Sequence, residues 1–134
     1  MPPLGIHHLG IAVHGLDEAI ARYGSLFGAR LEHRETLGEQ GVEAAALAVG
    51  ESRVELLAPL GDDTPVGRFL ARRGPGMHHV AFAVSDVAAE LDRLAAAGVE
   101  LIDRAPRRGL FGLQVAFVHP DATGGVLAEF VGDD

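Results

Sequence analysis

The sequence predicts an α+β fold built from two copies of one unit, in which a strand and a helix are followed by three more strands. The first observation is a repeat, because residues 7–31 (HHLGIAVHGLDEAIARYGSLFGARL) align with residues 78–101 (HHVAFAVSDVAAELDRLAAAGVEL), with one residue dropped from the second copy. The second is that each copy reads as an apolar strand and then a helix that ends at a glycine, Gly28 or Gly98. The third is that strand-like runs broken by turn residues follow both helices.

The first half is expected to form one helix and four strands. Its helix carries apolar residues at helical spacing, namely Ala19, Ile20, Tyr23 and Phe27. Three strands are expected after the helix, at about residues 31–37, 41–49 and 52–59. The segment VGES provides the hairpin turn between the last two strands.

The second half repeats this order after a connector, GDDTPVGRFLARRGPG, that is expected to contain its own short helix. Thr64 is the expected N-cap of that helix, and Pro65 takes the first helical position, where its missing N–H costs nothing. The helix of the second half is expected to carry Val87, Leu91 and Leu94, and its strands lie at about residues 100–104, 113–119 and 125–131, with HPDATGG as the last turn. We expect one domain over residues 1–134, with module 1 at about 5–62 and module 2 at about 76–132.

Composition removes several classes of function. The chain has 134 residues, no cysteine, no lysine and a formal charge of −8, so disulfides, thiolate chemistry and Schiff bases are excluded and nucleic acid is disfavoured as a partner. Its three serines lie outside any G-x-S-x-G setting, which argues against a serine hydrolase. No apolar stretch approaches the length of a membrane span, and the N-terminus lacks the pattern of a signal peptide, so we expect a cytoplasmic protein without a membrane partner.

Two histidine doublets open the first strand of each half. Because successive side chains of a strand point to opposite faces, His8 shares a face with Gly10 and Ala12, and His79 shares one with Ala81 and Ala83. The bulky residues that alternate with these positions point to the opposite face of each strand and are expected to form the core. Small neighbours leave room for an imidazole, although the sequence also permits His8 and His79 to be hydrogen-bonded core residues.

Each half also has one glutamate deep in an apolar strand. Glu55 lies within RVELLAPL, and Glu129 lies within GVLAEFVG. Because ionised carboxylates are rarely buried without compensation, two histidines and two glutamates form a plausible ligand set for a borderline divalent metal. The alternative is that the glutamates pair with Arg53 or face solvent on edge strands.

The quoted segments resemble a known superfamily. The resemblance runs from about residue 6 to residue 131 and rests on HHLGIAV, EQGV (39–42), VELLAPL (54–60), DTPVGRFLARRGPGMHHVAF (63–82), GVELIDRAPRRG (98–109) and HPDATGGVLAEF (119–130). The chain resembles the vicinal oxygen chelate superfamily, which includes glyoxalase I, extradiol dioxygenases and the bleomycin and fosfomycin resistance proteins. Within it, the methylmalonyl-CoA epimerases are the most similar group.

This resemblance implies paired βαβββ modules that form a curved, half-open mixed sheet barrel around a metal. The implied ligands are His8, Glu55, His79 and Glu129. The implied cofactor is a divalent metal ion, with cobalt favoured and nickel, manganese or zinc as alternatives. Some epimerases have glutamine at the position of Glu55, and glyoxalase I enzymes share the glutamate.

The resemblance implies an isomerase that removes and returns the C2 proton of methylmalonyl-CoA through a metal-stabilised enolate. Glu129 is the expected catalytic acid/base. The second acid/base is open, because Ala44 occupies the position of a glutamate in some family members. A water positioned by Gln40, Glu43 brought round by a bulge, or another group are the alternatives.

Two other functions are kept as alternatives. One is a glyoxalase I-type lactoylglutathione lyase, and the other is a non-catalytic small-molecule binding protein of the resistance type. The resemblance further implies an acyl-CoA substrate and a homodimer. Arginine clusters at 68–73 and 104–108 are the cations available for an anionic substrate.

Overall fold

The structure is a computed structural model that describes residues 3–133. The chain separates into two compact units. The N-terminal unit is His8–His78, and the C-terminal unit runs from His79 onward and includes the residues before His8. Both boundaries therefore fall inside a histidine doublet.

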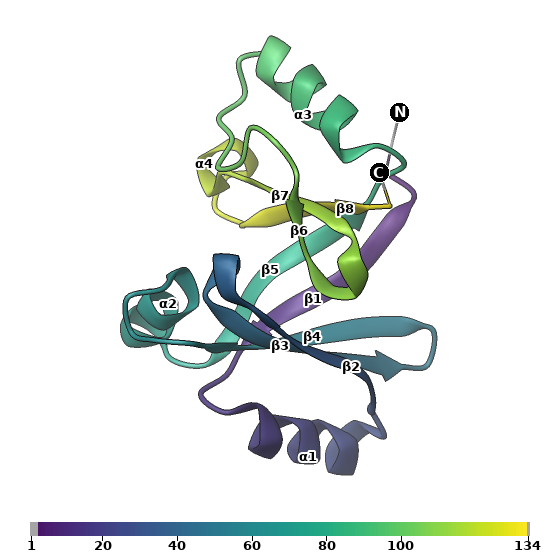
Figure 1. The fold of residues 1–134 in the computed structure, drawn as a ribbon, viewed down its shortest axis with the longest axis vertical. Coiled ribbons are helices and arrows are strands. Elements are labelled where there is room, and N and C mark those ends of the chain that lie inside the picture. The colour runs from purple at the N-terminus through teal and green to yellow at the C-terminus, as the bar shows by residue number, and fades with distance from the viewer. Residues whose placement is uncertain (1–2, 134) are drawn as a thin grey trace. The chain divides into compact units, whose positions relative to one another are not determined.

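The order of elements confirms the predicted repeat (Figure 1). The first set of elements is β1 (Gly5–Ala12), α1 (Leu16–Phe27), β2 (Arg30–Leu37), the 3₁₀ turn η1 (Gly38–Gln40), β3 (Val42–Val49) and β4 (Ser52–Pro59). The connector forms α2 (Pro65–Arg73). The second set is β5 (Gly76–Ala83), α3 (Val87–Ala96), β6 (Arg107–Arg108), η2 (Leu110–Gly112), β7 (Gln114–Val118), α4 (Pro120–Thr123) and β8 (Ala128–Gly132).

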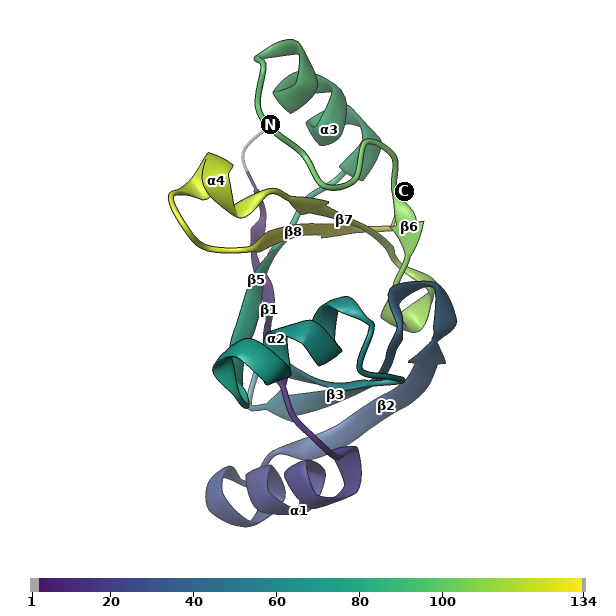
Figure 2. The ribbon, with the colours of Figure 1, turned by 90° about the vertical axis from the view of Figure 1, so that its left-hand side faces the viewer.

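The sheet of the N-terminal unit has the strand order β2-β3-β4-β1. Strands β2, β3 and β4 are antiparallel, and β1 runs parallel to β4. Helix α1 lies along one face of this sheet (Figures 1 and 2), where Leu16 and Ala19 pack against Leu47 and Leu56. Ile11 and Val13 join this cluster, so the bulky face of the first strand is core, as predicted.

The sheet of the C-terminal unit has the strand order β5-β8-β7-β6. Helix α3 covers one face, where Val87 and Leu91 pack with Val84 and Phe130. Strand β8 runs parallel to β5 and antiparallel to β7, so it is paired on both sides. This second core uses the bulky face of β5 in the same way that the first core uses that of β1.

Three local predictions were wrong. Residues 100–104 form no strand, because the Asp103 carboxylate accepts the Phe117 N–H at 2.9 Å and two successive N–H groups donate to the Phe117 carbonyl, which bends the chain. Only an isolated bridge from Leu101 to Val118 and the two-residue β6 remain. HPDATGG contains the short helix α4 rather than a plain turn. Phe27 is 62% exposed, so it lies outside the helical core face.

The connector helix begins as predicted. The Thr64 hydroxyl accepts the Gly67 N–H at 3.1 Å, and Pro65 takes the first turn. Helix α2 packs so closely on the preceding loop that a Cβ at Gly67 would collide with the Gly61 carbonyl and lie 2.7 Å from the Asp62 carbonyl. Among residues 3–133, the helices are all too short or too polar to cross a membrane.

Candidate metal-binding site

The first candidate ligand pair lies in the N-terminal unit. Strand alternation turns His8 away from the core formed with α1, and its side chain is nevertheless only 3% exposed. Its Nδ1 lies 3.1 Å from Oε2 of Glu55, a glutamate that is 8% exposed. Glu55 is held on β4, which is paired on both sides, so its position is fixed by two ladders of backbone hydrogen bonds.

The second pair has the same composition and lies in the C-terminal unit. Nε2 of His79 lies 3.2 Å from Oε1 of Glu129, and both residues are 5% exposed. The ring of Phe117 meets the imidazole edge-on, with ring centroids 5.3 Å apart. This aromatic contact fixes the plane of the His79 ring beside the carboxylate.

The donor atoms of each pair fit a divalent metal. Imidazole nitrogen and carboxylate oxygen both bind zinc-like ions at about 2.0 to 2.2 Å, so two ligands of one ion must lie within about 4.4 Å of each other. The measured separations of 3.1 and 3.2 Å meet that condition.

The alternative that the two glutamates face solvent on edge strands is wrong, because both are buried. Arg53 contacts Glu32 on β2, with its Nε 3.0 Å from Oε1 of Glu32. Neither glutamate is on an edge strand, because β4 and β8 each have a neighbour on both sides. The first histidines of the doublets differ from the second ones in burial, being only half-buried. The His78 ring packs edge-on against Phe69 at 5.0 Å.

The strand register places further residues on the same face as His8 and Glu55. One row across the sheet runs from Gly10 on β1 through Glu55 and Ala46 to His33 on β2. The next row runs through Ala12, Leu57, Ala44 and Glu35. Residues directly opposite one another in a sheet point to the same face, so His33 and Glu35 share the face of the candidate ligands.

Sequence reasoning missed His33 and Glu35. Their side chains form a pair, with Nε2 of His33 2.9 Å from Oε1 of Glu35. The alternation of His33, Glu35 and Leu37 along a strand was the signal available in the sequence. These residues become steadily more buried toward Leu37, whereas Arg34 and Thr36 between them are exposed.

Glu43 faces the other way. Its carboxylate binds Arg34, with Oε2 3.2 Å from Nε, and Arg34 also contacts Asp17 of α1 at 2.6 Å. Arg34 donates hydrogen bonds to Glu43 and to Asp17, and these bonds raise the pKa of Arg34 above its usual range, with Glu43 as the larger cause. The register between β3 and β4 is continuous from Val42 to Val49, so the bulge needed to turn Glu43 toward Glu55 is absent there.

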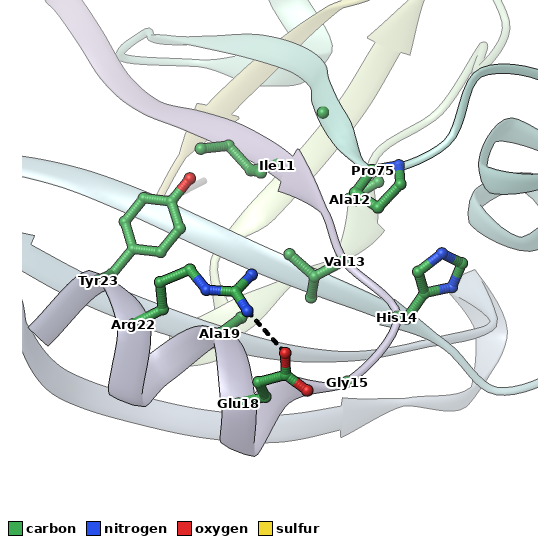
Figure 3. Close-up of a pocket in the computed structure, with 11 residues that line it drawn as sticks. Ile11, Ala12, Val13, His14, Gly15, Glu18, Ala19, Arg22, Tyr23 and Pro75 are labelled. Carbon is green, nitrogen blue, oxygen red and sulfur yellow. Dashed lines mark hydrogen bonds and ion pairs between the residues drawn. The ribbon is translucent and has the colours of Figure 1, made fainter. Parts of the chain in front are cut away.

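A separate hollow lies at the end of β1 beside α1 (Figure 3). Ile11, Val13 and Tyr23 line it, and Arg22 and Glu18 form an ion pair of 2.7 Å at its mouth. Because Ile11 and Val13 belong to the bulky face of β1, this hollow opens on the side opposite to His8.

Comparison with known proteins gives consistent matches along the chain. A family model described as the Glyoxalase/Bleomycin resistance protein/Dioxygenase superfamily matches residues 7–117. An ethylmalonyl-CoA/methylmalonyl-CoA epimerase of Cereibacter sphaeroides is 33% identical over 126 residues, which are 92% of this chain and 94% of that protein. The crystal structure of methylmalonyl-CoA epimerase from Mycobacterium tuberculosis is 40% identical, with a TM-score of 0.94, and the match covers 98% of this chain and 89% of that one.

A further solved structure is a methylmalonyl-CoA epimerase in complex with methylmalonyl-CoA and NH4+. It is 37% identical, with a TM-score of 0.95, and the match covers 98% of this chain and 96% of that one. The family model begins at the first doublet and reaches into β7, so it includes His8, Glu55 and His79. Because the match takes in the repeat and three of the four candidate ligands, the chain belongs to the glyoxalase, bleomycin resistance protein and dioxygenase superfamily.

Proposed function

We propose that this protein is an epimerase that interconverts (2R)- and (2S)-methylmalonyl-CoA. The observation that carries the proposal is a buried histidine–glutamate pair in each half of a chain that is similar to named methylmalonyl-CoA epimerases along nearly its whole length. One of those epimerases was solved with methylmalonyl-CoA, which supports an acyl-CoA substrate for this chain.

We infer that His8, Glu55, His79 and Glu129 together hold one divalent cation. Cobalt is the favoured metal, and nickel, manganese or zinc are alternatives, because imidazole and carboxylate ligands suit all of them. When bound, such a cation supplies positive charge that stabilises an enolate. The burial of all four side chains keeps competing water away from their donor atoms.

Glu129 is proposed as a catalytic acid/base. The C2 proton of methylmalonyl-CoA lies beside a thioester, whose enolate a bound cation would stabilise, so a positioned carboxylate can serve as the base that removes it. Nε2 of His79 lies 3.2 Å from Oε1 of Glu129, and the Phe117 ring packs edge-on against the His79 imidazole, so the carboxylate lies in a packed environment. Epimerisation then requires that a proton return to the opposite face of C2.

The direct test is exchange of the C2 proton in heavy water. Protein loaded with cobalt is incubated with methylmalonyl-CoA in D2O, and in parallel with the glutathione hemithioacetal of methylglyoxal. Deuterium at C2 with inversion of configuration is the expected result. Isomerisation of the glutathione adduct without exchange in methylmalonyl-CoA would instead identify a glyoxalase, and no turnover of either compound would indicate a binding protein.

Assembly and location are further parts of the proposal. We expect a homodimer, which light scattering of the purified protein would measure. We also expect a cytoplasmic location, which cell fractionation would test.

A further inference from the structure

We propose that Glu35, held by His33, is the second proton-transfer group of the epimerase and serves the face of C2 that Glu129 does not. This inference rests on the proposed function, because it assigns a step of that reaction. Its structural support comes from residues of the N-terminal unit, and the role of Glu129 is taken from the proposed function.

The first support is the position of the pair on the sheet. His33 stands in the same row as Glu55, two strands away, with Ala46 between them. Neighbouring strands lie about 4.8 Å apart, so the His33 and Glu55 backbones are separated by about 10 Å on one face. That is a span over which side chains from both ends can contact one small acyl group.

The second support is the size of the residues between them. Ala46 and Ala44 occupy β3 on this face, and the first lies directly between Glu55 and His33. No side chain longer than a methyl group stands in that row between the candidate ligand and the pair. A larger residue at position 46 would separate the two.

The third support is the chemistry of the pair. An imidazole N–H that donates to one carboxylate oxygen fixes the direction of the carboxylate, and a carboxylate held in this way can act as a base. His33 and Glu35 are 2.9 Å apart and half-buried, so the pair is partly shielded from water and still reachable. His33 is therefore a positioning residue and Glu35 the proton carrier.

Two other acids of β2 and β3 lie outside the continuous rows on this face. Glu43 points toward α1 and pairs with Arg34. Glu32 lies where the register between β2 and β3 shifts, and it pairs with Arg53 at 3.0 Å. Glu35 lies opposite Ala44 in the continuous part of the register, one row from that of Glu55.

The step balances without another reactant. The Glu35 carboxylate takes the C2 proton, the C–H bond breaks, and its electron pair delocalises into the thioester carbonyl. Protonated Glu129 then gives its proton to the other face of C2, where that electron pair forms the new C–H bond. The reverse reaction uses the same two groups with their protonation states exchanged.

The test uses single diastereomers of methylmalonyl-CoA in D2O, followed by NMR and by stereochemical analysis. In Glu35→Gln, inversion is expected to fall by about a hundredfold or more. Deuterium should still enter the one diastereomer whose C2 proton faces Glu129, with its configuration retained. Glu43→Gln is the matched control, because it removes a glutamate from the other face of the neighbouring strand, and it should invert both diastereomers at the wild-type rate.

A second pair of variants tests the positioning role. His33→Gln keeps a side-chain N–H donor and should retain more inversion than His33→Leu, which keeps size but no donor. Metal content and thermal midpoint are measured in each variant and should match those of the wild type, because neither His33 nor Glu35 is a proposed ligand.

Three results would overturn the inference. They are wild-type inversion in Glu35→Gln, loss of exchange from both diastereomers in that variant with metal and thermal midpoint unchanged, and loss of metal from it, which would make Glu35 a ligand. Failure of the wild-type protein to exchange either diastereomer is a different outcome, because it refutes the proposed function itself.

Discussion

The two units surround the same histidine–glutamate pair with different neighbours. In the N-terminal unit Glu55 lies between Gly10 and Ala46, and in the C-terminal unit Glu129 lies between Ala81 and Phe117. The repeated sequence therefore supplies a histidine and a glutamate in each unit. The neighbouring strand, β3 or β7, determines whether a small or a large side chain lies beside the glutamate. An alanine leaves the row around Glu55 open, and a phenylalanine packs against the histidine that holds Glu129.

The outer strands differ as well. Strand β2 has eight residues and β6 has two. Asp103 accepts a backbone N–H with its side chain in the segment before β6, so the chain bends where its counterpart in the N-terminal unit stays extended. Within residues 3–133, the full-length outer strand belongs to the N-terminal unit, and it carries His33 and Glu35.

The largest expected effect separates the two histidines of each doublet. His8→Ala and His79→Ala should each lose most bound metal and nearly all epimerase activity, because each removes a buried ligand. His7→Ala and His78→Ala, which alter the half-buried neighbours, should keep their metal. Metal analysis of the four purified variants checks this, and equal loss in all four would show that strand alternation does not define the site.

The next effect distinguishes the two glutamates. Glu129→Gln keeps an oxygen ligand but removes a base, so exchange at C2 should fall by about a hundredfold or more while much of the metal stays bound. Glu55→Gln also keeps an oxygen ligand and should retain far more exchange, because no proton transfer is assigned to Glu55. Similar losses of exchange in both variants would contradict the division of roles between the units.

A smaller effect probes the aromatic neighbour of the second pair. Phe117→Ala removes the ring that packs on His79, and it should lower the free energy of unfolding by about 2 to 3 kcal/mol, less than for a fully buried phenylalanine. Urea unfolding measures the change. Phe27→Ala is the matched control, since Phe27 is 62% exposed and should change stability little. An equal decrease in the free energy of unfolding for both variants would mean that the contact between Phe117 and His79 does not stabilise the fold.

The smallest expected effect compares two glycines in helices of the N-terminal unit. Gly67→Ala should destabilise by about 1 to 3 kcal/mol, because its Cβ would strike the loop before α2. Gly24→Ala in α1 meets only the Ala29 carbonyl at 3.5 Å and should stabilise by about 0.5 to 1 kcal/mol. The shifts in thermal midpoint should therefore have opposite signs in the two variants. A higher midpoint in Gly67→Ala would contradict the close packing of α2 on the loop that precedes it.

Much of the fold was predictable because local rules decide it. Alternation along β1 and β5 assigned His8 and His79 to one face, and their burial confirms that assignment. Helix ends followed from residues such as Thr64 and Gly28, whose roles depend on their own chemistry and backbone angles.

The rest depended on contacts between distant segments. The bend at Asp103 arises from a hydrogen bond to Phe117, which no local pattern indicates. His33 and Glu35 lie in a strand of alternating charge that is typical of an exposed edge. Their position on the same face as Glu55 follows only from the pairing of β2, β3 and β4. The register of such pairing cannot be inferred from the sequence of one strand alone.

The division of the chain at the two doublets bears on how such a protein could be taken apart. The C-terminal unit includes residues from before His8, and the Leu4 N–H donates to the Ala83 carbonyl at 2.7 Å. A gene fragment starting at position 79 would therefore encode that unit without its own opening segment. The unit that begins at His79 thus depends on a segment encoded more than seventy residues earlier, so the two halves cannot be separated by a single cut between them.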